Sequence, residues 1–284
     1  MSTDVLDHPT ATPPAAAVTP RTRSASSLKV TQGRLIASEW IKLRSLRSTL
    51  WTLGGAVVLL VGLGVLICYI RTTQTVPDGP GADQDATGLS LSGVMLGQFA
   101  IGVLGVLVVT GEYATGMIRA TLAAAPKRLP VLWAKVIVLP GVAFVVSLVS
   151  VLIAFFVSQA VLSGDGLQTT FGATGVARAV VGAALYLSVV GLLGVALGWL
   201  IRSTAGAVAS LFGLLLVLPI LFQLLPASWN DTVGPYLPGN AGQAVMTVTQ
   251  SGTSLAPWVG FAVFCGYAAI ALAAAAVQLK RRDA

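Results

Sequence analysis

Glu112 is a lone carboxylate in an apolar part of the chain, because no other acidic residue occurs between Asp85 and Asp165. Residues 115–125 follow it as a run that suits a short helix, with Gly116 four positions after the carboxylate. A carboxylate beside a helix N-terminus stabilises the helix by ~0.3 to 1 kcal/mol, so one interpretation is a helix cap or membrane-boundary marker. The other is a contact segment for a partner, because a plain connection between two helices would not need this length.

The residue types that carry most enzymatic and metal chemistry are scarce. Cys68 and Cys265 both stand inside apolar runs and the one histidine is His8, so neither a disulfide framework nor a Cys/His metal site can be assembled. The sequence has no Gly-x-x-x-x-Gly-Lys-Ser/Thr phosphate loop, and no Ser/His, paired-Asp or His-Glu-x-x-His set lies in an apolar run. We therefore predict no catalytic residues, no metal site and no ATP hydrolysis by this chain.

The composition places these residues in a membrane protein. Hydrophobic residues make up 55% of the 284 residues and charged residues 10%, and the mean hydropathy is +0.86; soluble domains carry about 25% charged residues. A charge at the centre of a membrane helix costs ~2.5 to 3.5 kcal/mol, so charge-free intervals mark the candidate spans. We predict an all-α bundle of six transmembrane helices, over residues 50–70, 91–111, 135–162, 178–201, 205–225 and 257–279.

The remaining segments are predicted from their composition. The N-terminal segment is rich in Ala, Thr, Pro and Ser and lacks the apolar surface to fold alone. The first apolar run begins near Leu50 and is long enough to span, which favours a retained first helix over a cleaved signal peptide. The predicted organisation is a disordered cytoplasmic tail (1–30), an interfacial amphipathic helix (31–49), the six-helix membrane domain (50–279) and a cytoplasmic C-terminal tail (280–284).

The lysines and arginines divide unevenly between the two faces of the bundle. Fifteen of the 17 lie on the side of the two termini, and the other side keeps only Arg71 and Arg178. By the positive-inside rule both termini are cytoplasmic. The net charge of +7 is then explained by topology and attraction to lipid rather than by nucleic-acid binding, since no folded basic domain exists. On the outer face, residues 227–256 form a predicted loop, with a short helix over 241–248 that could dip back into the membrane.

The segment before the first span is a candidate amphipathic helix at the inner membrane surface. Five apolar side chains fall on one arc at 100° per residue, namely Leu35, Ile36, Trp40, Leu43 and Leu46. Glu39 interrupts that arc and can reach Lys42 at i+3. Glu39, Trp40 and Lys42 are therefore the residues expected to place this helix. The alternative is a plain positively charged anchor with no partner.

Polar groups in the predicted spans bear on the class of transporter. The notable ones are all neutral: Gln98, Ser147, Ser150, Gln159, Tyr186, Ser188, Ser210 and Gln223. Such groups commonly form hydrogen bonds between helices, so no substrate-binding residue is assigned. A secondary transporter or channel not driven by ATP is the alternative, weakened because such proteins usually place an ionisable group within the membrane. The Gly93/Gly97 and Gly194/Gly198 spacings predict close packing within the bundle ahead of a dimer seam.

Together these features resemble the membrane-spanning permease subunits of ABC exporters, of the type-two class that includes drug, antibiotic and polysaccharide exporters. The resemblance covers about residues 31–279. In that family an interfacial helix precedes the first of six spans, which SEWIKLRSLRSTLWTL at residues 38–53 matches. A Glu at the end of the second span then opens a loop with a coupling helix, as in EYATGMIRATLAAAPKR, whose wording is similar to actinobacterial members. PYLPGNAGQAV at residues 235–245 resembles the family's outer re-entrant region.

The resemblance also implies roles and partners. It implies that the region coupled to a partner ATPase comprises Glu112, Gly116, Arg119, Pro126 and Arg128. ATP and Mg²⁺ would be bound by separate ABC ATPase subunits, with no cofactor on this chain. Closure of those subunits would tilt the helices of a permease dimer, formed with a second copy or a homologous permease in a bacterial plasma membrane, and open a path outward. Replacing Glu112 would leave folding nearly intact if the residue lies outside the lipid-packed spans.

The charge distribution generates a test of orientation. We predict that single cysteines placed near Gly81 and Gly252 react with a membrane-impermeant maleimide on whole cells, whereas those near Lys127 and Asp283 react only after permeabilisation. Labelling near Lys127 on intact cells would show that the assigned orientation is wrong.

Overall fold

The computed structural model describes residues 31–73, 85–124, 129–249 and 254–281. All regular elements in these residues are helical, which confirms the predicted all-α class. Six segments are long and apolar enough to cross a membrane: α2 (Arg47–Thr73), α4 (Val94–Ala114), α6 (Leu129–Leu162), α7 (Val176–Ile201), Thr204–Gln223 and α12 (Pro257–Arg281).

The six segments coincide with the six predicted spans, and the differences lie at their ends. Helix α6 begins at Leu129 rather than at residue 135, so Lys135 lies within the helix instead of bounding it. The sequence rule ended spans at charges because an unpaired charge is costly in lipid. The helix continues through Lys135 because that charge is paired with carboxylates of other helices.

Shorter helices connect the spans and flank them. Helix α1 ends at Ser45, and the extended backbone of Leu46 separates it from α2, so this helix is shorter than the predicted segment 31–49. Asp85 caps α3 by accepting a hydrogen bond from the amide of Gly88 at 2.6 Å. The short elements are α1 (Gln32–Ser45), α3 (Ala86–Ser90), η1 (Ser163–Asp165), α5 (Met117–Ala124), α10 (Ala227–Val233), η3 (Gly234–Tyr236), α11 (Pro238–Gln243) and η4 (Ala244–Met246).

Helices α4 and α7 form the centre of the bundle and pack backbone to backbone. A Cβ added at Gly105 would collide with the carbonyl of Gly191, and one added at Gly194 would collide with the carbonyl of Gly102. At Gly93 an added Cβ would collide with the backbone of Leu60 in α2. The glycine spacings thus serve packing within the bundle, as predicted.

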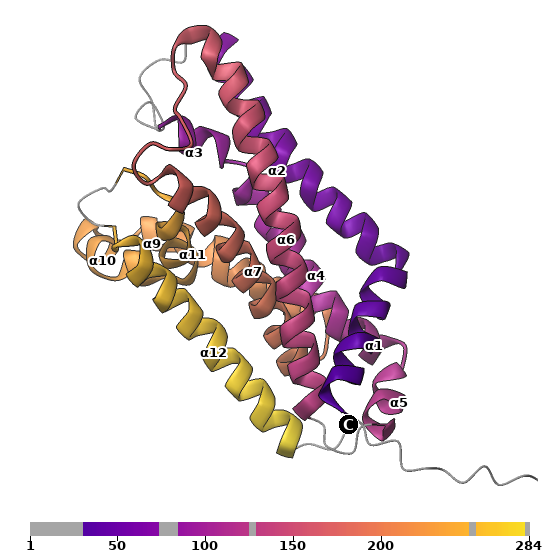
Figure 1. Cartoon of the computed structure of the whole chain (residues 1–284). Helices are drawn as coiled ribbons and strands as arrows, with labels where there is room; N and C mark the ends of the chain where they lie inside the picture. Colours follow the sequence, from indigo (N-terminus) through magenta and orange to yellow (C-terminus); the bar gives the residue numbers. More distant parts are fainter. Residues whose placement is uncertain (1–30, 74–84, 125–128, 250–253, 282–284) are drawn as a thin grey trace, which may run out of the picture. The chain divides into compact units, whose positions relative to one another are not determined.

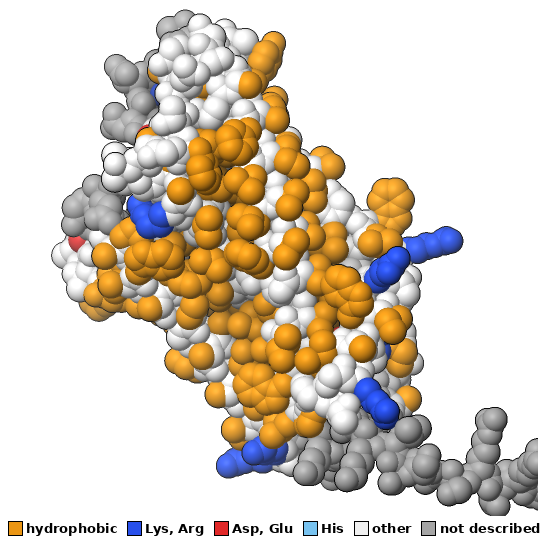
Figure 2. Space-filling view, in the orientation of Figure 1, with side chains coloured by type: hydrophobic (Ala, Val, Ile, Leu, Met, Phe, Trp, Pro, Cys, Tyr) orange, Lys and Arg blue, Asp and Glu red, His pale blue; other side chains and the backbone are white. Residues whose placement is uncertain are grey.

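The outer helices expose apolar side chains over much of their length. Most residues of α2 and α12 in their membrane-length windows are not buried, whereas most of those in α7 are. Figure 2 shows one face of the molecule covered largely by hydrophobic side chains, with the visible Lys and Arg side chains along its margins. An apolar surface of this extent is what a bilayer requires.

The fifth segment is interrupted where a short helix packs against it. It comprises α8 (Thr204–Phe212), a π-helical turn η2 (Gly213–Val217) and α9 (Leu218–Gln223). Pro219 has no amide hydrogen to donate to the carbonyl of Leu215, which favours such a distortion. Gly239 of α11 approaches that carbonyl so closely that an added Cβ would lie 3.0 Å from it.

Residues 238–246 form the short helix that was predicted within residues 227–256, but it begins before residue 241 and ends before residue 248. Helix α11 and η4 pack against α7 and α12, and Gly239, Ala241, Gly242 and Val245 are buried. Gly242 lies over the ring of Tyr186, where a Cβ would not fit. The hydroxyl of buried Tyr186 donates to the side-chain carbonyl of Gln98. This segment is therefore part of the bundle rather than a free loop.

The two ends of the bundle differ. Figure 1 shows α1, α5 and the C-terminal end of α12 together at one end, which we call the α1 end. Leu43, Ile118 and Leu279, from these three helices, belong to one buried apolar cluster there. At the other end, called the α10 end, α3 meets the segment after α11, and Thr249 donates to Asp85 at 3.3 Å.

The α4/α7 contact generates a stability prediction. We expect Gly105→Ala to destabilise the protein by ~1 to 3 kcal/mol, because the added methyl must displace a backbone carbonyl. Gly62→Ala is the control, since no atom lies within 4 Å of its added Cβ and alanine favours a helix over glycine. Thermal unfolding in detergent measures both; equal midpoints would contradict the assigned contact.

Candidate functional site

Four charged side chains from three helices meet at the α1 end. Glu39 and Lys42 come from α1, Glu112 from α4 and Lys135 from α6, and we call them the charged tetrad. The Lys42 ammonium lies 2.9 Å from Glu39 Oε1 and 2.8 Å from Glu112 Oε1. The Lys135 ammonium lies 2.7 Å from Glu39 Oε2 and 2.7 Å from Glu112 Oε1. Two carboxylates and two ammonium groups thus form a neutral, closed set.

Lys135 is the most deeply buried member of the tetrad. It is 1% exposed, and Glu39 and Glu112 are 3% and 5% exposed. Its ammonium also donates to the backbone carbonyl of Val108 at 3.3 Å, so three acceptors match its three protons. A buried ammonium tolerates removal from water only when it is paired and hydrogen-bonded in this way.

Local sequence accounts for one side of the tetrad. Glu39 and Lys42 are three residues apart and therefore share one face of α1. Glu112 is two residues from the end of α4, and Lys135 is six residues beyond the start of α6; both side chains reach α1 through ion pairs. The tetrad borders a cavity of about 200 Å³ with largely apolar walls, which include Leu43, Leu46, Leu107, Val108 and Met117.

The ammonium group of Lys42 keeps its positive charge at neutral pH. Burial alone would lower the pKa of Lys42, but the hydrogen bonds and charges of Glu112 and Glu39 outweigh burial and raise the pKa above its ordinary value. A raised pKa means that the pairing stabilises the fold below the ordinary lysine pKa and is lost only as the pH rises through the higher, folded-state value. Lys42 therefore holds its proton throughout the physiological range.

The interfacial-helix residues divide between two surfaces. The predicted Glu39 to Lys42 contact is confirmed, and both side chains face the bundle. Leu43 is buried, while Leu35 and Ile36 pack partly against the same cluster. Trp40 and Leu46, which were predicted on the same arc, are 52% and 46% exposed, so this part of the arc faces away from the bundle. The charged tetrad turns the Glu39 part of the arc inward.

The predicted coupling segment is shorter than the expected 115–125. Helix α5 spans Met117–Ala124, and Gly116 precedes it with φ +72°, a left-handed conformation that favours glycine. Ile118 anchors α5 in the bundle at 4% exposure, while Arg119 points to solvent. Pro126 and Arg128 lie outside the described residues.

Lys135 is the functional candidate that the sequence analysis missed. Its signal was a single lysine between the apolar runs VLWA and VIVLP, which needs an acidic partner if the helix includes it. The spans therefore contain ionisable groups, contrary to the sequence survey, but Lys135 and Glu112 sit near helix ends and pair with each other. The expectation that Glu112 could be replaced with folding intact also needs correction, because replacement would leave Lys135 underpaired in a buried site.

A second contact holds the other side of α4 at the same end. The guanidinium of Arg202 lies 5.4 Å from the ring centroid of Tyr113, and Tyr113 meets Trp199 edge to face at 5.9 Å. Arg202 adopts φ 58° at the turn between α7 and α8. Thr204 donates to Thr110 at 2.8 Å. The end of α4 that carries α5 is thus fixed from two directions.

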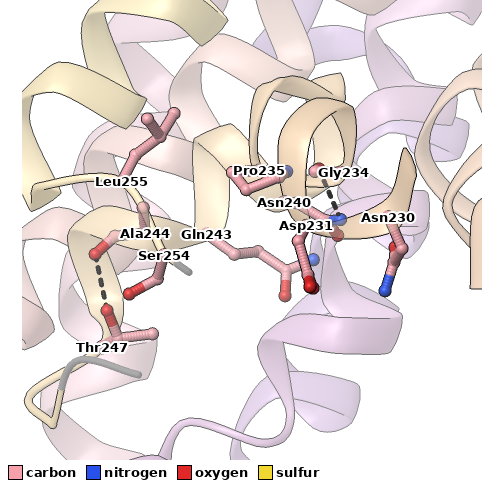
Figure 3. Close-up of a pocket in the computed structure, with 10 residues that line it drawn as sticks. All are labelled: Asn230, Asp231, Gly234, Pro235, Asn240, Gln243, Ala244, Thr247, Ser254 and Leu255. Carbon is pink, nitrogen blue, oxygen red and sulfur yellow. Dashed lines mark hydrogen bonds between the residues drawn. The ribbon is translucent and has the colours of Figure 1, made fainter. Parts of the chain in front are cut away.

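The α10 end carries a separate polar cavity of about 290 Å³ (Figure 3). Its walls include Asn230 and Asp231 of α10 and Asn240 and Gln243 of α11, and these side chains lie close together in Figure 3. Asn240 donates to the carbonyl of Gly234 at 2.9 Å. Leu255, just before α12, also borders it, so the length of α12 separates this cavity from the tetrad.

The tetrad generates a stability prediction. Lys135→Met should destabilise the protein by ~3 to 5 kcal/mol, because two buried carboxylates would share one remaining lysine. Adding Glu112→Gln should recover much of the loss, since Glu39 and Lys42 would remain as a neutral pair. Thermal unfolding in detergent measures each variant, with exposed Arg119→Met expected within ~0.5 kcal/mol of the parent protein. A double variant less stable than Lys135→Met would refute the pairing.

Comparison with known families identifies the chain. Residues 35–230 match the family described as ABC-2 family transporter protein. The matched region contains α5 and all four residues of the charged tetrad. A comparison with curated proteins gives no match. Because the family match covers more than half of the chain, the protein belongs to the ABC-2 transporter family and is a membrane permease subunit of an ABC transporter.

Proposed function

We propose that this permease forms the translocation path of an ATP-driven exporter and receives the work of a separate ABC ATPase through α5 and the charged tetrad. Membership of the ABC-2 family implies an ABC ATPase partner. ATP and Mg²⁺ bind to that partner, and this chain contributes the membrane path. A second copy of the permease, or a homologous one, completes the complex.

The observation that carries this proposal is the position of Glu112. It stands five residues before the first residue of α5 and accepts hydrogen bonds from lysines of α1 and α6. A displacement of α5 therefore acts on the end of α4 and, through the tetrad, on two further helices. Coupling requires contacts whose energy differs between the two states of the partner, and charge pairs with close geometry change energy steeply on small movements.

The lysines and arginines at the α1 end support the proposed orientation of the protein in the membrane. Arg34, Lys42, Arg44 and Arg119 lie on α1 and α5, and Lys280 and Arg281 end α12. By the positive-inside rule this end faces the cytoplasm of a bacterial cell, with both termini on that side. An ATPase that docks on α5 would then meet ATP in the cytoplasm.

A charge reversal on α5 tests the docking. Arg119 is exposed, so Arg119→Glu should leave insertion and unfolding nearly unchanged. Transport per assembled complex should fall at least tenfold, about 1.4 kcal/mol, while the ATPase still hydrolyses ATP. Arg281→Glu is the matched control, an exposed charge reversal on α12 at the same end. Full transport by Arg119→Glu would exclude α5 as the contact.

The tetrad's own part in coupling is measured with the compensated pair. The variant Glu112→Gln/Lys135→Met should fold but show reduced transport, because α4 and α6 lose the ionic link that couples them to α5. If it transports at the parent rate per folded complex, the tetrad contributes to stability and not to coupling. Thr232→Ala, an exposed position on α10, reports the effect of a neutral change at the other end.

A further inference from the structure

Two Trp/Arg pairs flank the break between α1 and α2. Trp40 and Arg44 are four residues apart on α1, and Arg47 and Trp51 are four residues apart on α2. Residues at this spacing are neighbours on a helix surface, so each arginine has a tryptophan beside it. All four are exposed, Trp51 at 80%. The pattern runs Trp, Arg, Arg, Trp across Leu46.

The two arginines lack carboxylate partners. Neither Arg44 nor Arg47 forms an ion pair or side-chain hydrogen bond with any residue that the structure describes. The tetrad uses the opposite face of α1, where Glu39 is buried. Three residues of chain span at most about 11 Å, so both guanidinium groups can reach one headgroup or two adjacent ones.

The patch lies at a membrane boundary. Arg47 is the first residue of α2, and no further charged residue follows in that helix until Arg71. Ile41 and Leu50 are also exposed, at 63% and 54%, beside the arginines. Tryptophans concentrate at the headgroup level of bilayers, and arginines flanking a span attract anionic headgroups. Figure 2 shows Lys and Arg side chains bordering the hydrophobic surface.

We propose that Arg44 and Arg47 form a binding site for the phosphate of an anionic phospholipid. Trp40 and Trp51 lie on either side of the headgroup, and Ile41 and Leu50 contact the part of the acyl chains nearest the headgroup. Guanidinium groups bind phosphate oxygens through paired N–H donors, which makes the phosphate the recognised group. The bound lipid holds the outer face of α1 while the tetrad holds its inner face.

An acidic surface of the partner ATPase is the competing occupant. The exposed Ile41, Leu50 and the two tryptophans favour lipid, because a soluble partner that bound them would have to bury four large apolar side chains at the level where α2 enters the bilayer. The site belongs to the permease alone and does not depend on the proposed coupling. It can therefore fail or hold without affecting the assignment of α5.

Lipid binding by the whole chain in detergent tests the site. Native mass spectrometry would follow a titration with phosphatidylglycerol, and phosphatidylcholine would serve as the zwitterionic comparison. Each arginine near an anionic surface contributes roughly fivefold in affinity, so Arg44→Gln/Arg47→Gln should weaken the first phosphatidylglycerol site about 25-fold. Lys280→Gln/Arg281→Gln removes the same charge from the end of α12 and should change it less than threefold.

Three outcomes would overturn the assignment. Equal losses in both double variants would show attraction to net charge without a site. Unchanged phosphatidylglycerol binding in Arg44→Gln/Arg47→Gln, combined with weaker ATPase association, would show that the two arginines bind the partner ATPase rather than lipid. A first site with equal affinity for phosphatidylcholine would exclude phosphate recognition by arginine.

Trp51→Ala, which leaves the charge intact, should weaken phosphatidylglycerol binding by severalfold, because the apolar edge of the site is lost.

Discussion

The buried ammonium of Lys135 is the constraint on which the α1 end depends. Removing an ion from water carries an effective penalty of several kcal/mol, so the helix that carries Lys135 is stable in this position only with acceptors around it. Glu112 and the carbonyl of Val108 come from α4, and Glu39 must come from α1. The requirement therefore ties α1, which has no membrane-spanning apolar length of its own, to two spans.

That placement determines what the rest of α1 presents. With Glu39, Lys42 and Leu43 directed into the bundle, Trp40 and Arg44 face away from it. An amphipathic helix without the tetrad would turn its apolar arc toward the lipid. Here part of that arc is used for a charged contact inside the protein. The lipid-facing surface is instead shared between exposed residues of α1 and the first turn of α2.

Different kinds of interaction hold the two ends of the bundle together. At the α1 end, ion pairs and a cation over an aromatic ring fix the end of α4 from two sides, and Gly116 supplies the change of direction into α5. At the α10 end, close backbone packing and neutral hydrogen bonds hold α11, where Gly242 meets Tyr186 and Gly239 meets the carbonyl freed by Pro219. Ionic attraction in a buried site thus holds the α1 end, whereas contacts between neutral groups hold the α10 end.

The sequence by itself determined the features that depend on local pattern. Six spans, their order, the Glu39 to Lys42 contact and the short helix after Pro238 follow from hydropathy, i to i+3 spacing and chain-breaking residues. Only the tertiary structure decided that Lys135 lies inside a helix and that Trp40 points outward. Lys135 pairs with a carboxylate 96 residues away, and such a pairing depends on which helices pack together rather than on neighbours in the chain. The start of α6 was misplaced for the same reason, because a charge ends a membrane helix only when no partner neutralises it.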